Sequence, residues 1–177
     1  MFRRIAFAIV VASLLATIAQ VIYYYPKLPD PVVSHFGADG VGNGLMSKAN
    51  FLIVYFLVQY GMAGLMFGIA WMMPFAPVST VNIPNKAIWL SEAYRTRFHS
   101  LTRSVMGWMA AITALFIALT FELTFQANLS NQKINQVVFW GALTVYLVGV
   151  SVVCVAYLII LKQPPQALRQ PPQASRE

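Results

Sequence analysis

The sequence has few charged residues, only five acidic ones among them, and a single cysteine in 177 residues. Charged residues make up 10% of the chain and hydrophobic residues 59%, whereas a typical soluble domain carries about 25% charged residues. A chain with so little charge cannot present most of its surface to water, which excludes an ordinary soluble domain. The single cysteine, Cys154, excludes an internal disulfide, and its place inside an apolar run is typical of a small packing residue.

What the sequence does contain is a set of long apolar runs. They lie at residues 5–25, 51–73, 105–125 and 137–161. A run of about 20 residues is long enough to cross a hydrocarbon core of about 30 Å as a helix. The sequence therefore predicts an all-α integral membrane protein whose domain, residues 1–163, has four transmembrane helices. QPPQA occurs twice from Gln163 onward, and residues 164–177 hold too few apolar residues to fold, so we predict that they form a disordered tail.

The positions of lysine and arginine predict the orientation. Nine of the 12 fall in the N-terminus, the second loop and the tail, and three fall in the other two loops. Because cytoplasmic loops are rich in these residues, we expect both termini and the second loop in the cytoplasm and the first loop outside. The net charge of +7 then reflects topology and not nucleic-acid binding. The first run also resembles a signal peptide, with small residues Thr17 and Ala19, but its continuation to three tyrosines favours a retained helix.

Small residues recur at four-residue spacing in three of the predicted helices. The stripes are Ala8, Ala12 and Ala16, then Gly64 and Gly68, then Ala110, Ala114 and Ala118. Such stripes let helices approach closely in a membrane. We expect packing within the bundle, and the alternative is a homodimer through the face that carries Gly64.

Three polar residues fall inside the apolar runs. Gln20, Gln59 and Glu122 all lie in the predicted outer half of the membrane. Polar groups are costly there and need partners. Either each is satisfied locally, or together they form the floor of an outward-facing polar pocket that the first loop covers.

The first loop, residues 23–48, is rich in proline and glycine. His35, Asp39 and Asn43 have neither the spacing of a calcium loop nor enough His or Cys for a zinc site. The glycines lack the context of a dinucleotide fingerprint, and we expect them to supply turns with positive φ. The sequence holds no nucleophile set, so we predict no catalytic residues, no metal, no cofactor and no enzymatic activity.

The second loop begins with two prolines, Pro74 and Pro77. A helical pattern follows from Ser91, with a mostly apolar face opposite charged residues. This face comprises Leu90, Tyr94, Phe98, Leu101 and Val105. The pattern predicts a basic amphipathic helix on the cytoplasmic leaflet that leads into the third transmembrane helix.

Two segments resemble a known family. LPDPVVSHFGADGVGNGLMSK is similar to the L-P-x-x-x-P-x-H-F-x-x-x-G-x-x-D-x-W-x-S-K signature of a bacterial membrane domain of unknown function, which also opens the SdpI-type toxin-immunity proteins. The matching positions are Leu28, Pro29, His35, Phe36, Gly40, Ser47 and Lys48. Val33, Asn43 and Leu45 replace the usual Pro, Asp and Trp. NIPNKAIWL resembles the same family's N-x-P-N-K-x-x-W-L element, so the likeness spans roughly residues 1–125.

The resemblance implies a structured extracytoplasmic first loop in a bacterial inner-membrane protein. It implies self-protection against a membrane-targeting toxin, with the lipid bilayer and a protein as partners. The candidate partner-binding residues are His35, Phe36, Pro29, Asp39 and Lys48. The second-loop motif comprises Asn82, Pro84, Asn85, Lys86 and Trp89. The alternatives are an accessory subunit that recruits a partner through the basic second loop, and a small transporter that uses Gln20, Gln59 and Glu122.

Overall fold

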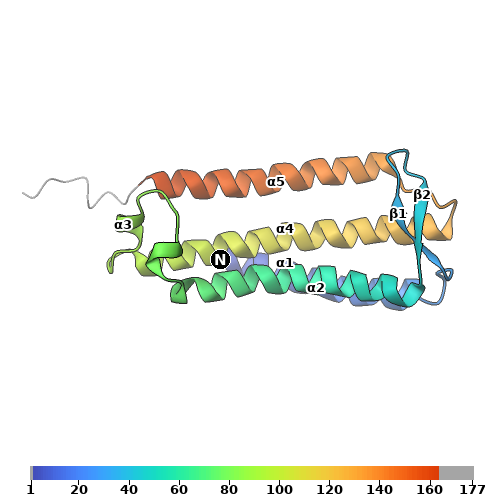
Figure 1. Ribbon diagram of the computed structural model, residues 1–177, viewed down its shortest axis with the longest axis horizontal. Helices are drawn as coiled ribbons and strands as arrows, with labels where there is room; N and C mark the ends of the chain where they lie inside the picture. The colour runs from blue at the N-terminus through green and yellow to red at the C-terminus, as the bar shows by residue number, and fades with distance from the viewer. Residues whose placement is uncertain (1, 164–177) are drawn as a thin grey trace, which may run out of the picture.

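The computed structural model describes residues 2–163 of the chain, so the predicted tail at 164–177 lies outside the described residues. Within them, four helices are long and apolar enough to cross a membrane. They are α1 (Phe2–Tyr24), α2 (Lys48–Met72), α4 (Arg95–Leu129) and α5 (Gln136–Lys162). The four run side by side along the long axis of the molecule (Figure 1). The prediction of a helical membrane protein with four spans is confirmed at this level.

The helices begin earlier or end later than the apolar runs alone suggest. Two helices begin at polar N-cap residues. The Ser47 side chain accepts a hydrogen bond from the Asn50 backbone N–H at the start of α2, and the Asn135 side chain accepts one from the Val138 backbone N–H at the start of α5. α4 has 35 residues and is about 50 Å long. It is one continuous helix from Arg95, so the separate amphipathic helix predicted from Ser91 does not form; most of that pattern belongs to the first turns of α4.

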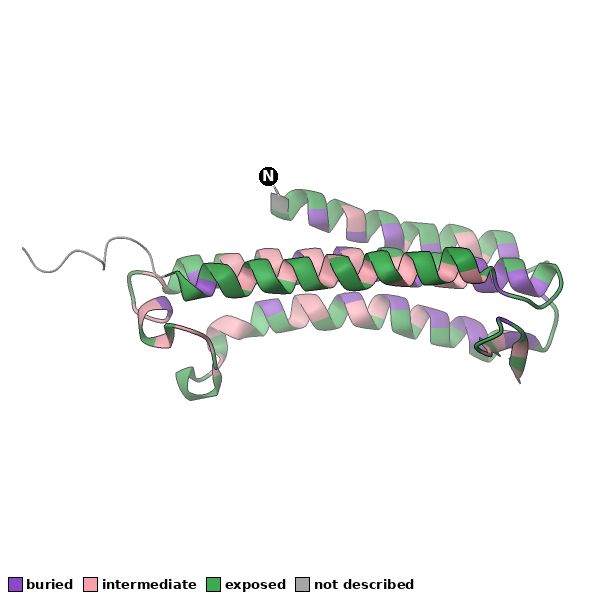
Figure 2. Ribbon diagram, turned by 90° about the horizontal axis from the view of Figure 1, so that it is seen from above, coloured by how far each residue is buried: buried purple, intermediate pink, exposed green. Residues whose placement is uncertain are grey.

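A three-helix core of α1, α2 and α4 carries most of the packing, and α5 lies chiefly against α4. Figure 2, in which α5 is nearest the viewer, shows it almost entirely exposed or intermediate. Most of its exposed side chains are large and apolar, as suits a helix that faces lipid. Leu161, near its end, is the one residue of α5 that is fully buried.

The small-residue stripes pack only in part as predicted. Ala110 and Ala114 are buried in α4. Ala8, Ala12 and Ala16 are exposed, and α1 instead packs through a neighbouring stripe. This stripe comprises Ala6, Val10, Ser13 and Thr17. A Cβ on Gly64 or Gly68 would meet nothing within 4 Å, so the predicted packing of these glycines within the bundle is wrong.

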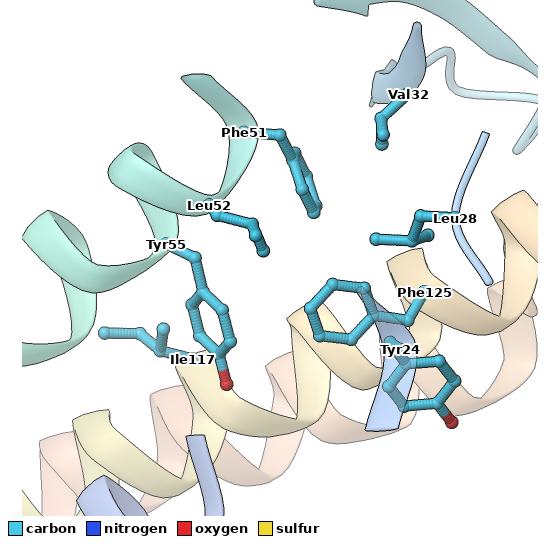
Figure 3. Close-up of a cluster of buried hydrophobic side chains, with 8 residues drawn as sticks. All are labelled: Tyr24, Leu28, Val32, Phe51, Leu52, Tyr55, Ile117 and Phe125. Atoms are coloured by element: carbon cyan, nitrogen blue, oxygen red, sulfur yellow. The ribbon is translucent and has the colours of Figure 1, made fainter. Parts of the chain in front are cut away.

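A two-stranded antiparallel hairpin covers one end of the bundle, which we call the hairpin end (Figure 1). Its strands are β1 (Val32–Phe36) and β2 (Gly42–Met46). An aromatic cluster lies beneath it, where Leu28 and Val32 point toward Phe125 of α4 and Phe51 of α2 (Figure 3). The opposite end carries the second loop, with the short helices η1 (Met73–Phe75), η2 (Val78–Thr80) and α3 (Lys86–Trp89).

Candidate functional site at the hairpin end

The hairpin is fixed to α4 by one buried side chain, Asn128. Its Oδ1 accepts a hydrogen bond from the Val33 backbone N–H at 2.8 Å, and its Nδ2 donates to the Val33 carbonyl at 2.9 Å. The same Nδ2 also donates to the Thr124 carbonyl at 2.9 Å. Val33 is 2% exposed, so these backbone groups would have no water to bind without Asn128. Sequence reasoning missed this residue, although an asparagine near the end of an apolar helix is a signal.

The loop between α4 and α5 holds the tip of the hairpin from another side. Gly42 N–H donates to the Gln132 carbonyl at 2.9 Å, and Ile134 N–H donates to the Gly40 carbonyl at 2.9 Å. The side chain of Gln136, the first residue of α5, donates to the Ala38 carbonyl at 2.5 Å. The predicted structured first loop is therefore a hairpin whose tip is bound by the third loop.

The glycines of the hairpin serve mainly to allow close approach. Gly40 is the one glycine with positive φ in the described chain, at 77°. Gly42 lies where a Cβ would collide with the Val33 side chain, and a Cβ on Gly44 would lie 2.8 Å from the His35 Cβ. The expectation that these glycines all supply positive φ is therefore wrong for Gly37, Gly42 and Gly44, and the last two form part of β2.

His35 and Phe36 lie beside a small pocket beneath the hairpin. The exposed His35 ring pairs its Nδ1 with Asn43 Oδ1 at 2.5 Å, across the two strands. The pocket has a volume of about 190 Å³. Phe36 lines it from the hairpin, and polar and aromatic side chains of α4 and α5 line the other walls. These are Thr120, Thr124, Gln136, Phe139 and Trp140. We call this the hairpin pocket.

The other candidate residues of the first loop have local structural contacts. Lys48 Nζ donates to the carbonyls of Tyr25 and Leu28, each at 3.2 Å, and so ties the start of α2 to the end of α1. Asp39 Oδ1 accepts from the Val41 backbone at 3.0 Å within the hairpin turn. Pro29 is exposed between α1 and the hairpin. Of the five candidates, His35 and Phe36 are those that the structure brings to a pocket.

Glu122 is the centre of a polar network between α1, α2 and α4. Its carboxylate accepts hydrogen bonds from the Tyr24 hydroxyl, from Gln20 Nε2 at 2.8 Å and from Gln126 Nε2 at 2.8 Å. Gln20 Oε1 in turn accepts from the Tyr55 hydroxyl at 2.5 Å. Gln20 and Glu122 thus contact each other, and each is satisfied by local partners, which is the first of the two alternatives that the sequence left open. The sequence analysis did not identify Tyr24, Tyr55 or Gln126 as their partners.

Gln59 lies deeper and outside this network. It is fully buried, and its Nε2 donates to the Ala114 carbonyl at 3.2 Å. Its Oε1 has no hydrogen-bond partner among the described residues, and neither has the Oγ of the buried Ser13. The polar residues of the bundle therefore continue toward its middle, but not as one connected chain.

The predicted pocket with the first loop as roof and Glu122 as floor is not what the chain builds. The floor of the hairpin pocket on α4 consists of Thr120 and Thr124. Glu122 lies two residues from each, which in a helix places it on the opposite side, toward Gln20 and Tyr24 of α1. The hairpin pocket and the Glu122 network are therefore two separate sites on two faces of α4.

The second-loop motif caps the carboxyl end of α5. Asn85, with a left-handed φ of 53°, donates from Nδ2 to the Leu161 and Lys162 carbonyls at 3.0 and 3.1 Å. Trp89, 1% exposed, donates from Nε1 to the Leu161 carbonyl at 2.9 Å. These carbonyls have no intrahelical donor, because they belong to the last turn. Lys86 Nζ donates to the Ser79 carbonyl at 3.4 Å, while Pro84 is half-buried and Asn82 is exposed.

The described residues contain no group of three or more His, Cys, Asp or Glu side chains that could hold a metal ion. The prediction that the chain has no catalytic residues stays a prediction. What the hairpin end offers is a fixed surface with a small pocket and exposed aromatic and apolar side chains, and such a surface is suited to binding.

Comparison with known proteins gives one family match. No curated protein and no solved structure matches the chain. The matched segment covers most of α1, the whole hairpin and the first half of α2, whereas the second-loop motif lies outside it. Residues 9–59 of the chain are thus similar to the family described as a domain of unknown function, DUF1648.

Proposed function

We propose that this chain is an immunity protein of the bacterial inner membrane, which protects the producing cell by binding a membrane-active toxin at the hairpin end. The first-loop signature and its likeness to SdpI-type proteins support the toxin-immunity part of the proposal. One structural observation supports the binding surface: the hairpin is held by Asn128 and by the third loop, while His35 and Leu45 stay exposed, Leu45 by 65%.

A fixed surface of this kind favours recognition because little conformational entropy is lost on binding. The hairpin pocket, at about 190 Å³, has room for one side chain of a partner. Tyr23 and Trp140 are 58% and 54% exposed near the same end, where aromatic side chains contact headgroups. A toxin that approaches or enters the bilayer from outside would meet this surface first in the orientation that the lysines and arginines favour.

One alternative retains support from a specific observation. The Glu122 network places an acidic side chain and two amides within apolar helices, which favours a role in moving a solute or proton. The accessory-subunit alternative, in which the basic second loop recruits a partner, has no such observation in its favour, and Asn85 and Trp89 of that loop are engaged with the end of α5. Flux of solutes or protons into liposomes with purified protein would favour the transporter over the immunity protein.

The test is survival of cells that co-express the protein with a membrane-active peptide toxin, beginning with any secreted peptide that the adjacent reading frame encodes. Phe36→Ala removes an aromatic anchor, and we expect about a thirtyfold loss of toxin affinity with loss of protection. His35→Ala removes a directed hydrogen bond, and we expect about a fivefold loss. Phe75→Ala is the matched control, because Phe75 is 74% exposed at the opposite end.

Membrane levels of each variant are measured beside survival. Full protection by Phe36→Ala and His35→Ala, at normal levels, would contradict the proposal. If both variants fail to accumulate while Phe75→Ala does not, the hairpin is a structural cap and not a recognition surface.

A further inference from the structure

A groove opens between α1, α2 and α4 at the end opposite the hairpin. It has a volume of about 480 Å³. Its walls are mostly apolar, with Phe7 from α1 and Phe67 and Trp71 from α2. Its lining also includes arginine side chains from two helices, Arg3 and Arg4 of α1 and Arg103 of α4. Neither the hairpin pocket nor the Glu122 network includes any of these residues.

Aromatic side chains of α1 and α2 meet in the apolar part of the groove. The rings of Phe7 and Phe67 meet edge to face with centroids 6.0 Å apart. Phe7 is 56% and Trp71 is 68% exposed, so both rings present apolar surface to the groove and its surroundings. At the floor, a Cβ on Gly107 would lie 3.7 Å from the Ala6 Cβ, so α1 and α4 are in close contact behind the groove.

The arginines stand one helical turn from the apolar lining on both helices. Arg3 precedes Phe7 by four residues, and Arg103 precedes Gly107 by four, so each pair shares one face of its helix. Of the acidic residues in the described chain, Asp30, Asp39 and Glu122 belong to the hairpin end, and Glu92 does not line the groove. The groove therefore combines a positively charged rim with an apolar wall.

We propose that this groove binds one anionic phospholipid, with its phosphate at the arginines and an acyl chain along Phe7, Phe67 and Trp71. Guanidinium groups bind phosphate oxygens through paired charge-assisted hydrogen bonds. Basic pockets between transmembrane helices suit anionic headgroups, and apolar side chains below them suit the chain of the same molecule. The proposal does not depend on the toxin-immunity function, because it rests on residues at the other end of the bundle.

The experiment is native mass spectrometry of the full chain in a non-ionic detergent, titrated with phosphatidylglycerol or with phosphatidylcholine of the same acyl chains. We expect one phosphatidylglycerol to bind in preference to phosphatidylcholine. Arg103→Gln is expected to lower phosphatidylglycerol affinity about fivefold, the effect of one basic residue near an anionic headgroup. Arg103→Lys keeps the charge and is expected to lose less.

The matched control is Arg97→Gln, which removes an exposed arginine of the same helix that does not line the groove. The proposal predicts no effect of Arg97→Gln. An equal loss in Arg97→Gln and Arg103→Gln would show diffuse charge attraction and overturn it, as would equal affinity for the two lipids. Competition with soluble glycerol phosphate tests whether the groove needs the acyl chain. If glycerol phosphate displaces bound phosphatidylglycerol at concentrations similar to those of the lipid, the groove is a free-phosphate site and the proposal is overturned.

Discussion

The Asn128 side chain forms hydrogen bonds with both the backbone N–H and the backbone carbonyl of Val33. It thereby joins a strand of the hairpin to α4. One side-chain amide provides the two hydrogen bonds that a neighbouring strand would otherwise supply. The position is 8% exposed, which makes the pairing a requirement of burial as well as of geometry. The rigidity of the proposed binding surface depends on this contact together with the hydrogen bonds at the tip of the hairpin.

We predict that Asn128→Ala lowers the free energy of unfolding by about 2 kcal/mol or more, because it leaves a buried N–H and a buried carbonyl unpaired. The measurement is unfolding of the purified protein in mixed micelles with increasing denaturing detergent. Asn50→Ala is the control, since Asn50 is exposed and only its backbone takes part in the cap of α2. An equal stability of the two variants would show that the hairpin does not need Asn128.

Two glycines of the chain give a second comparison at the scale of one methyl group. Gly42→Ala places a Cβ against the Val33 side chain, whereas Gly61→Ala places one where nothing lies within 4 Å. We expect Gly42→Ala to destabilise the protein by about 1–3 kcal/mol, as overpacking does, and Gly61→Ala to be neutral or stabilising in a helix. Proteolysis of the hairpin in detergent is the measurement, and faster cleavage is expected in Gly42→Ala alone. Similar cleavage of both variants would contradict the close packing of β2 on β1.

Among the elements, α5 depends most on contacts at its ends. Along its length it lies chiefly against α4, and at its carboxyl end the Asn85 and Trp89 side chains bind its last carbonyls. The positive φ of Asn85 is one that asparagine adopts more readily than most residues. The NIPNKAIWL motif therefore acts as a cap supplied by a distant part of the chain.

We predict that Trp89→Phe, which keeps an aromatic ring but loses the Nε1 donor, raises amide hydrogen exchange in the last turn of α5. The expected loss is about 1 kcal/mol of local stability, the value of one hydrogen bond. Asn85→Gly combined with Trp89→Phe should give a larger increase, because Leu161 then loses both donors. Trp71→Phe serves as the control, since Trp71 is 68% exposed on α2. Unchanged exchange in the double variant would mean that the cap has no effect.

The sequence predicts the transmembrane helices well, but it does not predict the hairpin strands or the partners of individual side chains. The four spans follow from run length and apolarity, which are local properties. The hairpin strands do not, because Gly42 and Gly44 have low strand propensity and β2 forms through its neighbours. The partner of Trp89 is 72 residues away in sequence, and no local pattern encodes such a pairing.

For the candidate site the sequence analysis found the polar residues but not their arrangement. Gln20 and Glu122 stood out because polar residues inside apolar runs are rare. Tyr24 and Tyr55 did not, because tyrosine near a membrane surface is common and its hydroxyl partner depends on the packing of three helices. The assignment of Glu122 to the pocket near His35 was wrong, because it used only the position of Glu122 along the length of its helix. That position does not tell which face of the helix carries the side chain.

At the scale of the whole molecule, the orientation is a prediction that cysteine labelling tests. In a Cys154→Ala background, Asn43→Cys should react with a membrane-impermeant thiol reagent in intact spheroplasts, and Ser91→Cys should react only after lysis. The two positions lie at opposite ends of the bundle: Asn43 is exposed in β2, and Ser91 lies between α3 and α4. Labelling of Ser91→Cys alone in intact cells would reverse the orientation and place the hairpin in the cytoplasm.

The attachment of α5 at its two ends has a consequence for biogenesis. The contacts at one end come from the hairpin and those at the other from the second loop, and all of these segments leave the ribosome before α5 does. We expect α1, α2 and α4 to form a native-like membrane intermediate during synthesis, with Trp89 and the Ala38 carbonyl not yet bound. Insertion of α5 would then form the contacts at both ends of the bundle in one step. A chain arrested before residue 136 would lack these contacts, and we expect it to be a substrate for membrane quality-control proteases.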